Sequence, residues 1–237
     1  MTDLGPLRIT AGFMCSLVLA TPPAQAETPL SPVPYTNLEL MLDAAIRFEA
    51  LPRRAEPGIA LDSPVRAGLA WLGERLGGQS VFNNMQHDRL SGAPHTPLSV
   101  VAGAPGASLS AAYHRGFGST ALFPLGPAGF PALNSRGEGA VAILFDHDQP
   151  AFGLRVHSDY AAPLGQARPQ GYVTLTFYTR EGHLITRHRQ RLNTAVTELG
   201  FARAGHTPDI AAITITNDDP GGIALDDILY QTAPAAF

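Results

Sequence analysis

From residue 140 onward, apolar and polar positions alternate in short runs that turn-forming residues separate. In the segment 172–178, Val173, Leu175 and Phe177 alternate with tyrosine and threonine. A period of two is typical of a half-buried β-strand. The pattern predicts strands over Ala140–Phe145, Phe152–Val156, Tyr172–Tyr178, Leu184–Gln190, Val196–Phe201, Ile210–Thr216 and Ile223–Tyr230. Strands at this spacing, with almost no helix between them, indicate an all-β fold, an antiparallel β-sandwich or barrel.

The first 139 residues are less regular. Thr36 and Glu39 have capping-box spacing before an apolar run, which predicts one short helix near the N-terminus. We expect a loose lead-in over residues 27–45 and one sandwich domain over residues 46–231, with a tail over residues 232–237. Glycine and proline recur between residues 52 and 139 and mark turns. The strands predicted before residue 140 are Phe48–Leu51, Gln79–Phe82, Leu98–Val101 and Leu109–Tyr113.

The N-terminus has the features of a secretory signal peptide. Arg8 precedes the apolar run 11–20, and small residues follow up to Ala26 in an A-x-A cleavage pattern. The run is shorter than the roughly 20 apolar residues that a membrane-spanning helix needs. We expect residues 1–26 to be removed and the protein to be secreted or periplasmic, without a membrane span. Cleavage would also remove Cys15, the only cysteine, so the core must hold the domain together without disulfides.

The charge composition of the chain indicates which classes of binding partner to expect. The net charge is −4, and all 16 basic residues are arginines. A nucleic-acid-binding domain is expected to be basic, so this balance argues against nucleic acid. The length suits a single sandwich domain, which we expect to be a monomer.

Two adjacent carboxylates interrupt the last predicted strand. Asp226 and Asp227 follow Leu225 and precede Ile228. Adjacent strand residues point to opposite faces, so one aspartate is expected to face inward. A buried carboxylate is costly unless it is paired or holds a metal. The pattern therefore predicts a structural cation site at this strand.

Several segments, in their order along the chain, resemble a known family. They are Phe48-Glu49, Gly153–Val156, Leu175–Leu184, Leu199–Phe201 and Ile223–Ile228. This order resembles the jelly-roll domains of exported bacterial proteins of the PEP-CTERM-associated kind, and is similar to carbohydrate-binding jelly rolls and MAM-type domains. The resemblance spans roughly residues 46–231 and implies an antiparallel jelly-roll β-sandwich. The chain ends at Phe237 without the PEP-CTERM tail, so we expect a released product.

The resemblance also implies a structural calcium. In such jelly rolls the ion joins an acidic residue on the first strand to an aspartate on the last, which correspond here to Glu49 and to Asp226 or Asp227. Calcium takes six to eight oxygen ligands, including carboxylates and backbone carbonyls. The alternative is that Glu49 is exposed to solvent and one aspartate accepts backbone N–H bonds.

One predicted surface combines rings with hydrogen-bonding groups. If Phe152, Leu154 and Val156 point inward, their neighbours on the strand point outward, and the same holds for the strand 172–178. The outward set is Arg155, His157, Tyr172, Thr174, Thr176 and Tyr178. Such a face suits a polysaccharide or cell-surface glycan, and Tyr172 and Tyr178 would lie about 20 Å apart. The alternative is an ordinary solvated β-face, where threonine and tyrosine are common.

Catalytic signatures are absent, so no catalytic residue is predicted. The chain has no H-E-x-x-H, P-loop or G-x-G-x-x-G pattern. Glycosidase carboxylates follow no local spacing, so a glycan-active hydrolase using loop carboxylates stays an alternative, as does a purely structural surface or matrix protein. A close cluster of two or more buried or cleft acids with raised pKa would favour the hydrolase, and a shallow aromatic groove without such a pair would favour the binding module. Trp71, the only tryptophan, is expected in the core. The favoured interpretation is a secreted, non-catalytic binding module for carbohydrate or extracellular matrix, with a structural calcium.

Overall fold

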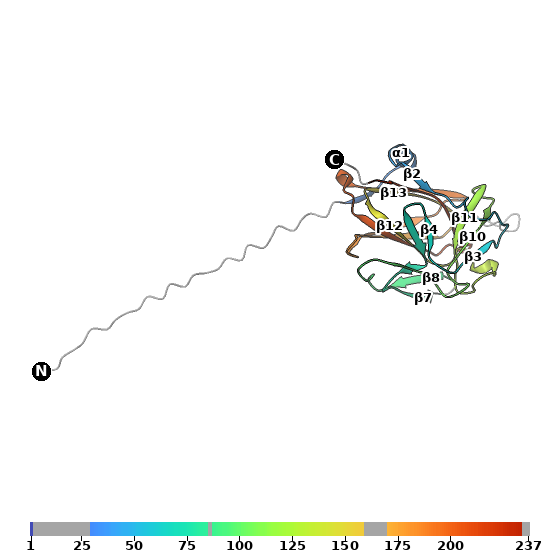
Figure 1. The fold of residues 1–237 in the computed structure, drawn as a ribbon, viewed down its shortest axis with the longest axis horizontal. Helices are drawn as coiled ribbons and strands as arrows, with labels where there is room; N and C mark the ends of the chain where they lie inside the picture. Colours follow the sequence, from blue (N-terminus) through green and yellow to red (C-terminus); the bar gives the residue numbers. More distant parts are fainter. Residues whose placement is uncertain (2–28, 85–86, 159–169, 234–237) are drawn as a thin grey trace.

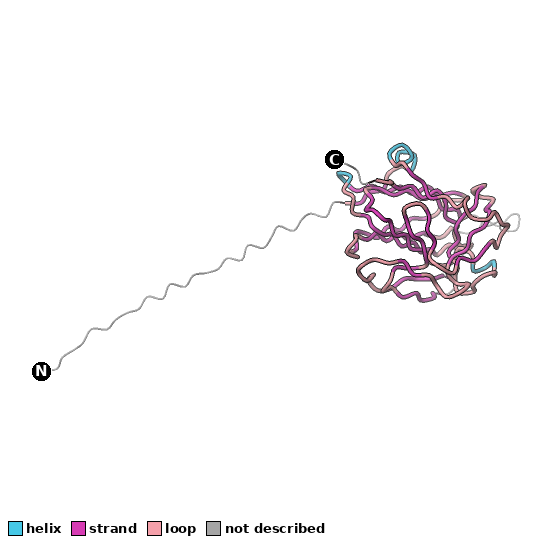
Figure 2. The backbone as a smooth tube through the Cα atoms, viewed as in Figure 1, coloured by secondary structure: helices cyan, strands magenta, loops and turns pink. Residues whose placement is uncertain are grey.

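Two antiparallel β-sheets packed face to face form the body of the protein (Figures 1 and 2). The computed structural model describes residues 1, 29–84, 87–158 and 170–233, so the predicted signal peptide lies almost wholly outside the described residues. The all-β sandwich prediction is confirmed, while the jelly-roll topology stays a prediction.

The eight-stranded sheet has the order β1 (Leu30–Pro32), β16 (Val196–Arg203), β13 (Ala151–His157), β18 (Ala224–Tyr230), β11 (Ser119–Pro124), β10 (Leu109–His114) and β3 (Ile59–Leu61), with β2 (Ala44–Ile46) paired to β18. The six-stranded sheet has the order β15 (Leu184–Arg191), β14 (Tyr172–Tyr178), β17 (Ile210–Asn217), β12 (Val141–Gln149), β5 (Ala70–Gly73) and β4 (Val65–Ala67). Two small ribbons pair β6 (Arg75–Leu76) with β9 (Val100–Val101), and β7 (Ser80–Asn84) with β8 (His87–Ser91). Two 3-10 turns lie at Leu133–Ser135 and Ala204–His206.

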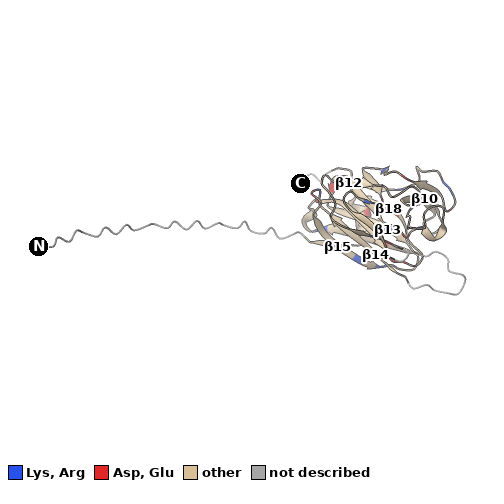
Figure 3. Ribbon diagram, turned by 90° about the horizontal axis from the view of Figure 1, so that it is seen from below, with Lys and Arg blue, Asp and Glu red and all other residues tan. Residues whose placement is uncertain are grey.

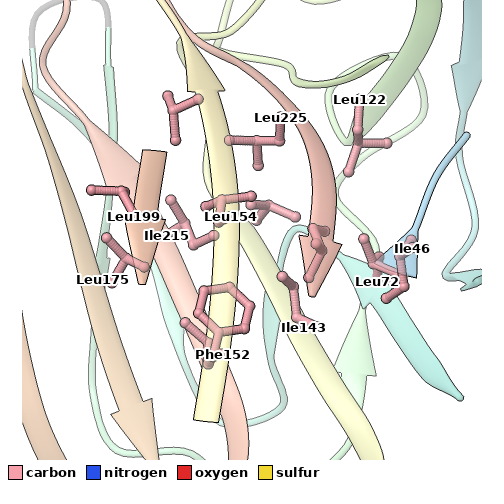
Figure 4. Packing of buried hydrophobic residues seen from close by; sticks show 14 of the residues in the cluster. Ile46, Leu72, Leu122, Ile143, Phe152, Leu154, Leu175, Leu199, Ile215 and Leu225 are labelled. Carbon is pink, nitrogen blue, oxygen red and sulfur yellow. The ribbon is translucent and has the colours of Figure 1, made fainter. Parts of the chain in front are cut away.

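The core lies between the two sheets and is built from their inward positions (Figure 4). Leu154 of β13 and Leu225 of β18 come from one sheet, and Leu175 of β14 and Ile215 of β17 from the other. The alternation in the sequence thus becomes a shared apolar layer, because every second side chain of each strand faces the opposite sheet.

The segment predicted as a loose lead-in belongs to the sandwich. Its residues form β1, which pairs with β16, and β2, which pairs with β18. Phe48–Leu51, predicted as the first strand, is instead a turn in which Leu51 N–H donates to Phe48 O at 3.0 Å. The predicted first strand is therefore wrong, and the first paired strand begins at Leu30. Three-residue strands are too short to show a period of two in the sequence.

The predicted helix is present as α1 (Tyr35–Met41), but it begins earlier than the capping box suggested. Pro34 is at the N-cap and no side chain caps the helix, so Thr36 lies inside the first turn. Tyr35 and Leu38 are buried against the outer face of β13 and β16. No helix among the described residues is long and apolar enough to cross a membrane.

The segments 75–84 and 87–101, together called the cover, lie over the middle of the outer face of the six-stranded sheet. Leu76 packs there with Tyr178, Ala142 and Ala212, and the hairpin β7–β8 extends along β17. Figure 1 shows this hairpin on the side of the body opposite α1. Gln79–Phe82, predicted as a strand, therefore belongs to a ribbon that lies over the sandwich.

Candidate functional site

The four residues predicted to bind a ligand on one surface lie on two different sheets. Tyr172 and Tyr178 are on β14 of the six-stranded sheet, whereas Arg155 and His157 are on β13 of the eight-stranded sheet. Within each strand the predicted inward residues do reach the core. The prediction of a single surface is nevertheless wrong, because alternation assigns a side within a strand and does not say which sheet the strand joins.

Arg155 faces outward but is held by acidic side chains. Its guanidinium donates to Asp227 Oδ2 at 2.9 Å and to Glu198 Oε1 at 2.9 Å. It also lies 4.8 Å from the centre of the Tyr35 ring, and the Tyr35 hydroxyl donates to the backbone oxygen of Asp227 at 2.8 Å. Arg155 therefore joins α1 to the sheet beneath it.

His157 is buried in a chain of polar groups on the outer face of the eight-stranded sheet. Its Nδ1 lies 2.8 Å from Nε2 of His114, whose Nδ1 lies 2.8 Å from Oε1 of Glu56. Arg136 donates to the other oxygen of Glu56. Partial burial alone would raise the pKa of Glu56, but the His114 hydrogen bond and the Arg136 charge outweigh it and lower that pKa. His157 is 5% exposed, which does not fit an open ligand-binding face.

A β-bulge in β18 changes the expected orientation of Asp226 and Asp227. Arg155 pairs with Asp226, so the two share the outer face, and the register shifts before Gly153 pairs with Leu229. Asp227 has a φ of +47°, the left-handed conformation that bulges accommodate. Leu225 and Ile228, three residues apart, both reach the core. The expectation that one aspartate faces into the sandwich is wrong, since it assumed unbroken alternation.

Asp226 is buried on the outer side, at 1% exposure. Ser119 donates to its Oδ2, and the backbone N–H of Asp227 donates to its Oδ1 at 2.9 Å. Burial raises the pKa of Asp226 to about 6, and the charges of Asp227 and Glu49 add to this, despite the two hydrogen bonds. Glu49 itself is exposed. This arrangement matches the alternative considered for the sequence, an exposed Glu49 and an aspartate bonded to backbone N–H.

The side chains around Asp227 do not fit a calcium ion. Its Oδ1 accepts a hydrogen bond from Arg47 at 2.8 Å, and its Oδ2 accepts one from Arg155 at 2.9 Å. Two guanidinium cations thus occupy the carboxylate that would bind the metal, and calcium needs six to eight oxygens. Within the described ranges, no three His, Cys, Asp or Glu side chains come together as metal ligands.

Tyr172 and Tyr178 face outward from the six-stranded sheet without forming an exposed pair of rings. Tyr178 is 7% exposed because the cover, residues 75–84 and 87–101, lies over it, and its hydroxyl accepts a hydrogen bond from Gln79 Nε2 at 3.1 Å. Tyr172 is half-buried, with the Arg189 guanidinium 3.6 Å from its ring centre. The prediction of an open aromatic platform spanning about 20 Å is therefore wrong.

The same face carries a polar groove beside the cover. Its volume is about 390 Å³, within the range of small-ligand sites. We call it the threonine groove. Its floor is the outer face of β14 and β17, one wall is β8 with the residues after it, and the other wall is β15. The lining residues are Gln79, Arg89, Leu90, Ser91, Gly92, Thr174, Thr176, Tyr178, Arg187, Arg189, Thr214, Thr216 and Asp218.

Four threonines form the floor as two cross-strand pairs. Thr176 pairs with Thr214, and Thr174 with Thr216, on neighbouring antiparallel strands. Thr176 is 6% exposed and Thr214 is 3% exposed. None of the four hydroxyls is hydrogen-bonded to another residue that the structure describes. None of these hydroxyl oxygens is among the buried side-chain atoms that lack a partner in the described part of the chain, so they open into the groove, where a ligand that supplies donors and acceptors can reach them.

Asp218 is the only carboxylate among the described residues that line the groove. It accepts hydrogen bonds from the backbone N–H of Tyr172 at 2.6 Å and from Arg189 Nη2 at 2.8 Å. Partial burial would raise its pKa, but these bonds and the charges of Arg189 and Arg89 outweigh that effect and lower the pKa. Asp218 is therefore ionised and unsuited to act as a general acid.

Carboxyl groups with raised pKa lie outside the groove lining. Burial raises the pKa of Glu138 to about 7, and the neighbouring charge of Asp219 adds to this. Burial also raises the pKa of Asp88 to about 6. Glu138 is 4% exposed, and its Oε2 has no hydrogen-bond partner among the described residues. Like Asp226, these acids are buried, whereas a glycosidase presents its two carboxyl groups to the substrate.

Trp71 lies at the surface, on the other side of the cover. It is 42% exposed, so the prediction of a core tryptophan is wrong. With Pro64, Leu98, Val100 and Leu144 it lines an apolar hollow of about 430 Å³. Trp71 pairs with Leu144 on β12, whose outward side chains continue the face of the threonine groove.

The sequence predicted the outward orientation of two of the four threonines that form the floor of the threonine groove. It placed Thr174 and Thr176 outward, but it did not single out Thr214, Thr216 or the arginines of the walls. The repeated T-x-T spacing was a signal, because residues two apart share a face. What the spacing could not show is that β14 and β17, about 40 residues apart in the chain, are neighbours.

Comparison with known proteins adds no family to this description. No protein-family model matches the chain, and no match was found among curated proteins.

Proposed function

We propose that this protein is an exported, non-catalytic binding module that holds a carbohydrate chain in the threonine groove. The observation that carries the proposal is the floor of four threonine hydroxyls without partners among the described residues, two of them more than nine-tenths buried. A sugar ring carries several neighbouring hydroxyl groups, and each of them can donate and accept a hydrogen bond, as each threonine hydroxyl of the floor can. Gln79 and Tyr178, already hydrogen-bonded to each other, add further polar groups at the rim.

The hydrolase is the weaker candidate because of where the acids lie. Asp218 in the groove has a lowered pKa, and the acids with raised pKa do not line it. A glycosidase needs one protonated and one ionised carboxyl group on either side of the scissile bond. A purely structural role predicts that no glycan binds in this groove.

Thr214→Val and Thr176→Val test the proposal directly. Valine keeps the shape of threonine and removes the hydroxyl, so folding stability should hold or rise where the hydroxyl had no partner. Each hydroxyl that bonds a sugar contributes roughly 1 kcal/mol, so each change should weaken binding about fivefold. The measurement is calorimetric titration with a glycan first selected on a glycan array.

Thr186→Val is the matched control, because Thr186 lies on β15 but outside the groove lining. It should leave the affinity unchanged. Failure to bind any glycan on the array, or equal losses with all three variants, would contradict the proposal. Release of reducing ends that stops when Glu138 or Asp219 is substituted would favour the hydrolase instead.

A further inference from the structure

The threonine groove is positively charged in an acidic protein. The chain carries a net charge of −4, yet three arginines and one aspartate line the groove. Partly enclosed clefts that carry one sign of charge concentrate the opposite sign from solution. The arginines of β15 mark that strand in blue in Figure 3. The local excess of positive charge is therefore a property of this groove and not of the whole molecule.

Two of the three arginines are fixed by their neighbours. Arg189 donates to Asp218 Oδ2 at 2.8 Å and lies against the Tyr172 ring. Arg89 donates to the backbone oxygen of Asn217 at 2.9 Å, and its Nη2 lies 3.8 Å from Asp218. Asp218 thus serves two guanidinium groups and neutralises at most one of them.

Arg187 has no hydrogen-bond or ion-pair partner among the described residues. It pairs with Thr176 across β15 and β14, and Thr176 pairs in turn with Thr214 on β17. Arg189, Thr174 and Thr216 form a second row of the same kind. Neighbouring strands are about 4.8 Å apart, so in each row the Cα of the arginine lies about 10 Å from the Cα of the far threonine.

We propose that the ligand of the threonine groove is an acidic glycan, a chain of sugars that carry carboxylate or sulfate groups. This rests on the glycan-binding role proposed above. The threonine pairs bind sugar hydroxyls, and the arginine at the end of each row binds the anionic group. Guanidinium groups bind carboxylate and sulfate oxygens through paired, charge-assisted N–H donors, and a neutral sugar lacks the charge that strengthens these bonds. Arg187, which has no carboxylate partner in the described part of the chain, is the main contact of this kind.

The test compares polygalacturonate with fully methyl-esterified polygalacturonate, in which the backbone is the same and the charge is removed. We expect the purified protein to bind the acid form at least tenfold more tightly in calorimetry, and we expect this difference to shrink as salt rises. Dextran sulfate is the sulfate arm, with neutral dextran as its counterpart. A single-stranded oligonucleotide controls for any polyanion.

Arg187→Gln should lower the affinity for the acid form about tenfold. Arg191→Gln is the matched control, because Arg191 is an exposed arginine of the same strand outside the groove lining and its loss changes the net charge equally. It should leave the affinity nearly unchanged. Equal losses with the two variants would show that only overall charge matters and would overturn the inference.

The outcomes separate this inference from the proposed function. Binding of a neutral glycan, weakened by Thr214→Val but insensitive to Arg187→Gln, would overturn the acidic ligand and keep the glycan-binding role. Binding of neither charged nor neutral glycans would overturn both. Oligonucleotide binding as tight as that of both acidic glycans would also overturn the inference.

Discussion

Asp226 shows that a buried carboxylate can have hydrogen-bond partners and still lower the stability of the folded protein when it is ionised. It accepts two hydrogen bonds, yet burial raises its pKa from the usual 3.8 to about 6. The folded state therefore holds a proton on Asp226 more tightly than the unfolded state does. The contribution of this group to stability is most favourable below pH 4 and is lost as the pH rises through 6.

We expect Asp226→Asn to be more stable than the wild type at pH 8 by about 1–3 kcal/mol, because the amide carries no charge to bury. Asparagine keeps an acceptor for the Asp227 N–H, and Ser119 can rotate its hydroxyl to accept from the amide. The advantage should disappear near pH 4, where Asp226 is protonated. Urea unfolding at pH 4, 6 and 8 measures this difference. A difference that does not change with pH would contradict the explanation.

The two arginines that contact Asp227 also lead to a prediction about calcium. Because Arg47 and Arg155 already neutralise Asp227, we expect EDTA to leave the melting temperature of the wild type unchanged. Asp227→Asn is the control and should destabilise the protein, since it weakens both ion pairs. A fall in melting temperature with EDTA, reversed by calcium, would show that the metal binds after all.

At the scale of elements, glycines allow α1 to lie directly on the eight-stranded sheet. Gly153 and Gly200 pair across β13 and β16 beneath the helix. A Cβ on Gly200 would lie 2.5 Å from the backbone oxygen of Val33 and 3.1 Å from Leu38 Cδ1. The helix has seven residues and no side-chain cap, so its stability comes from this contact and not from its own sequence.

Gly200→Ala should therefore destabilise the protein by about 1–3 kcal/mol, as overpacking does. The specific expectation is that α1 moves off the sheet. If it does, Leu38→Ala should cost much less in the Gly200→Ala background than in the wild type, because Leu38 would already be displaced. A double-mutant cycle in urea measures this coupling. Additive effects would mean that the helix stays in place and the strain is absorbed elsewhere.

At the scale of the whole molecule, the two outer faces of the sandwich differ. The outer face of the eight-stranded sheet is closed by α1, by the ion pairs around Arg155 and by the buried chain from Glu56 to His157. The outer face of the six-stranded sheet is covered only in its middle, which leaves the threonine groove on one side and the Trp71 hollow on the other. A ligand is therefore expected on the six-stranded face alone.

Export is the expectation for the whole chain that rests on its first 26 residues. Protein recovered from the periplasm or the medium should begin at Glu27, and N-terminal sequencing checks this. A chain that retains Met1 in a membrane fraction would contradict the signal peptide.

The sequence by itself determined the fold class and most strands after residue 140. Tyr172–Tyr178 begins and ends where it was predicted, because inward apolar and outward polar residues alternate there without interruption. Ser119–Pro124 was missed because its outer face is also buried, against Ala112 and Ala224, so the alternation is lost. The alternation of apolar and polar residues can be recognised in the sequence wherever one side of a strand faces the core and the other side faces solvent.

Only the tertiary structure determined whether an outward side chain is covered, exposed or part of a groove. Tyr178 and Trp71 both lie outward on the six-stranded sheet, yet the cover, residues 75–84 and 87–101, buries the first and leaves the second exposed. The bulge at Asp227 kept that side chain out of the core, so both aspartates lie on the outer side, where Ser119 reaches Asp226. The threonine groove exists because β14, β15 and β17 became neighbours. Strand order, cover and bulges depend on contacts between residues far apart in the chain, so no local pattern could specify them.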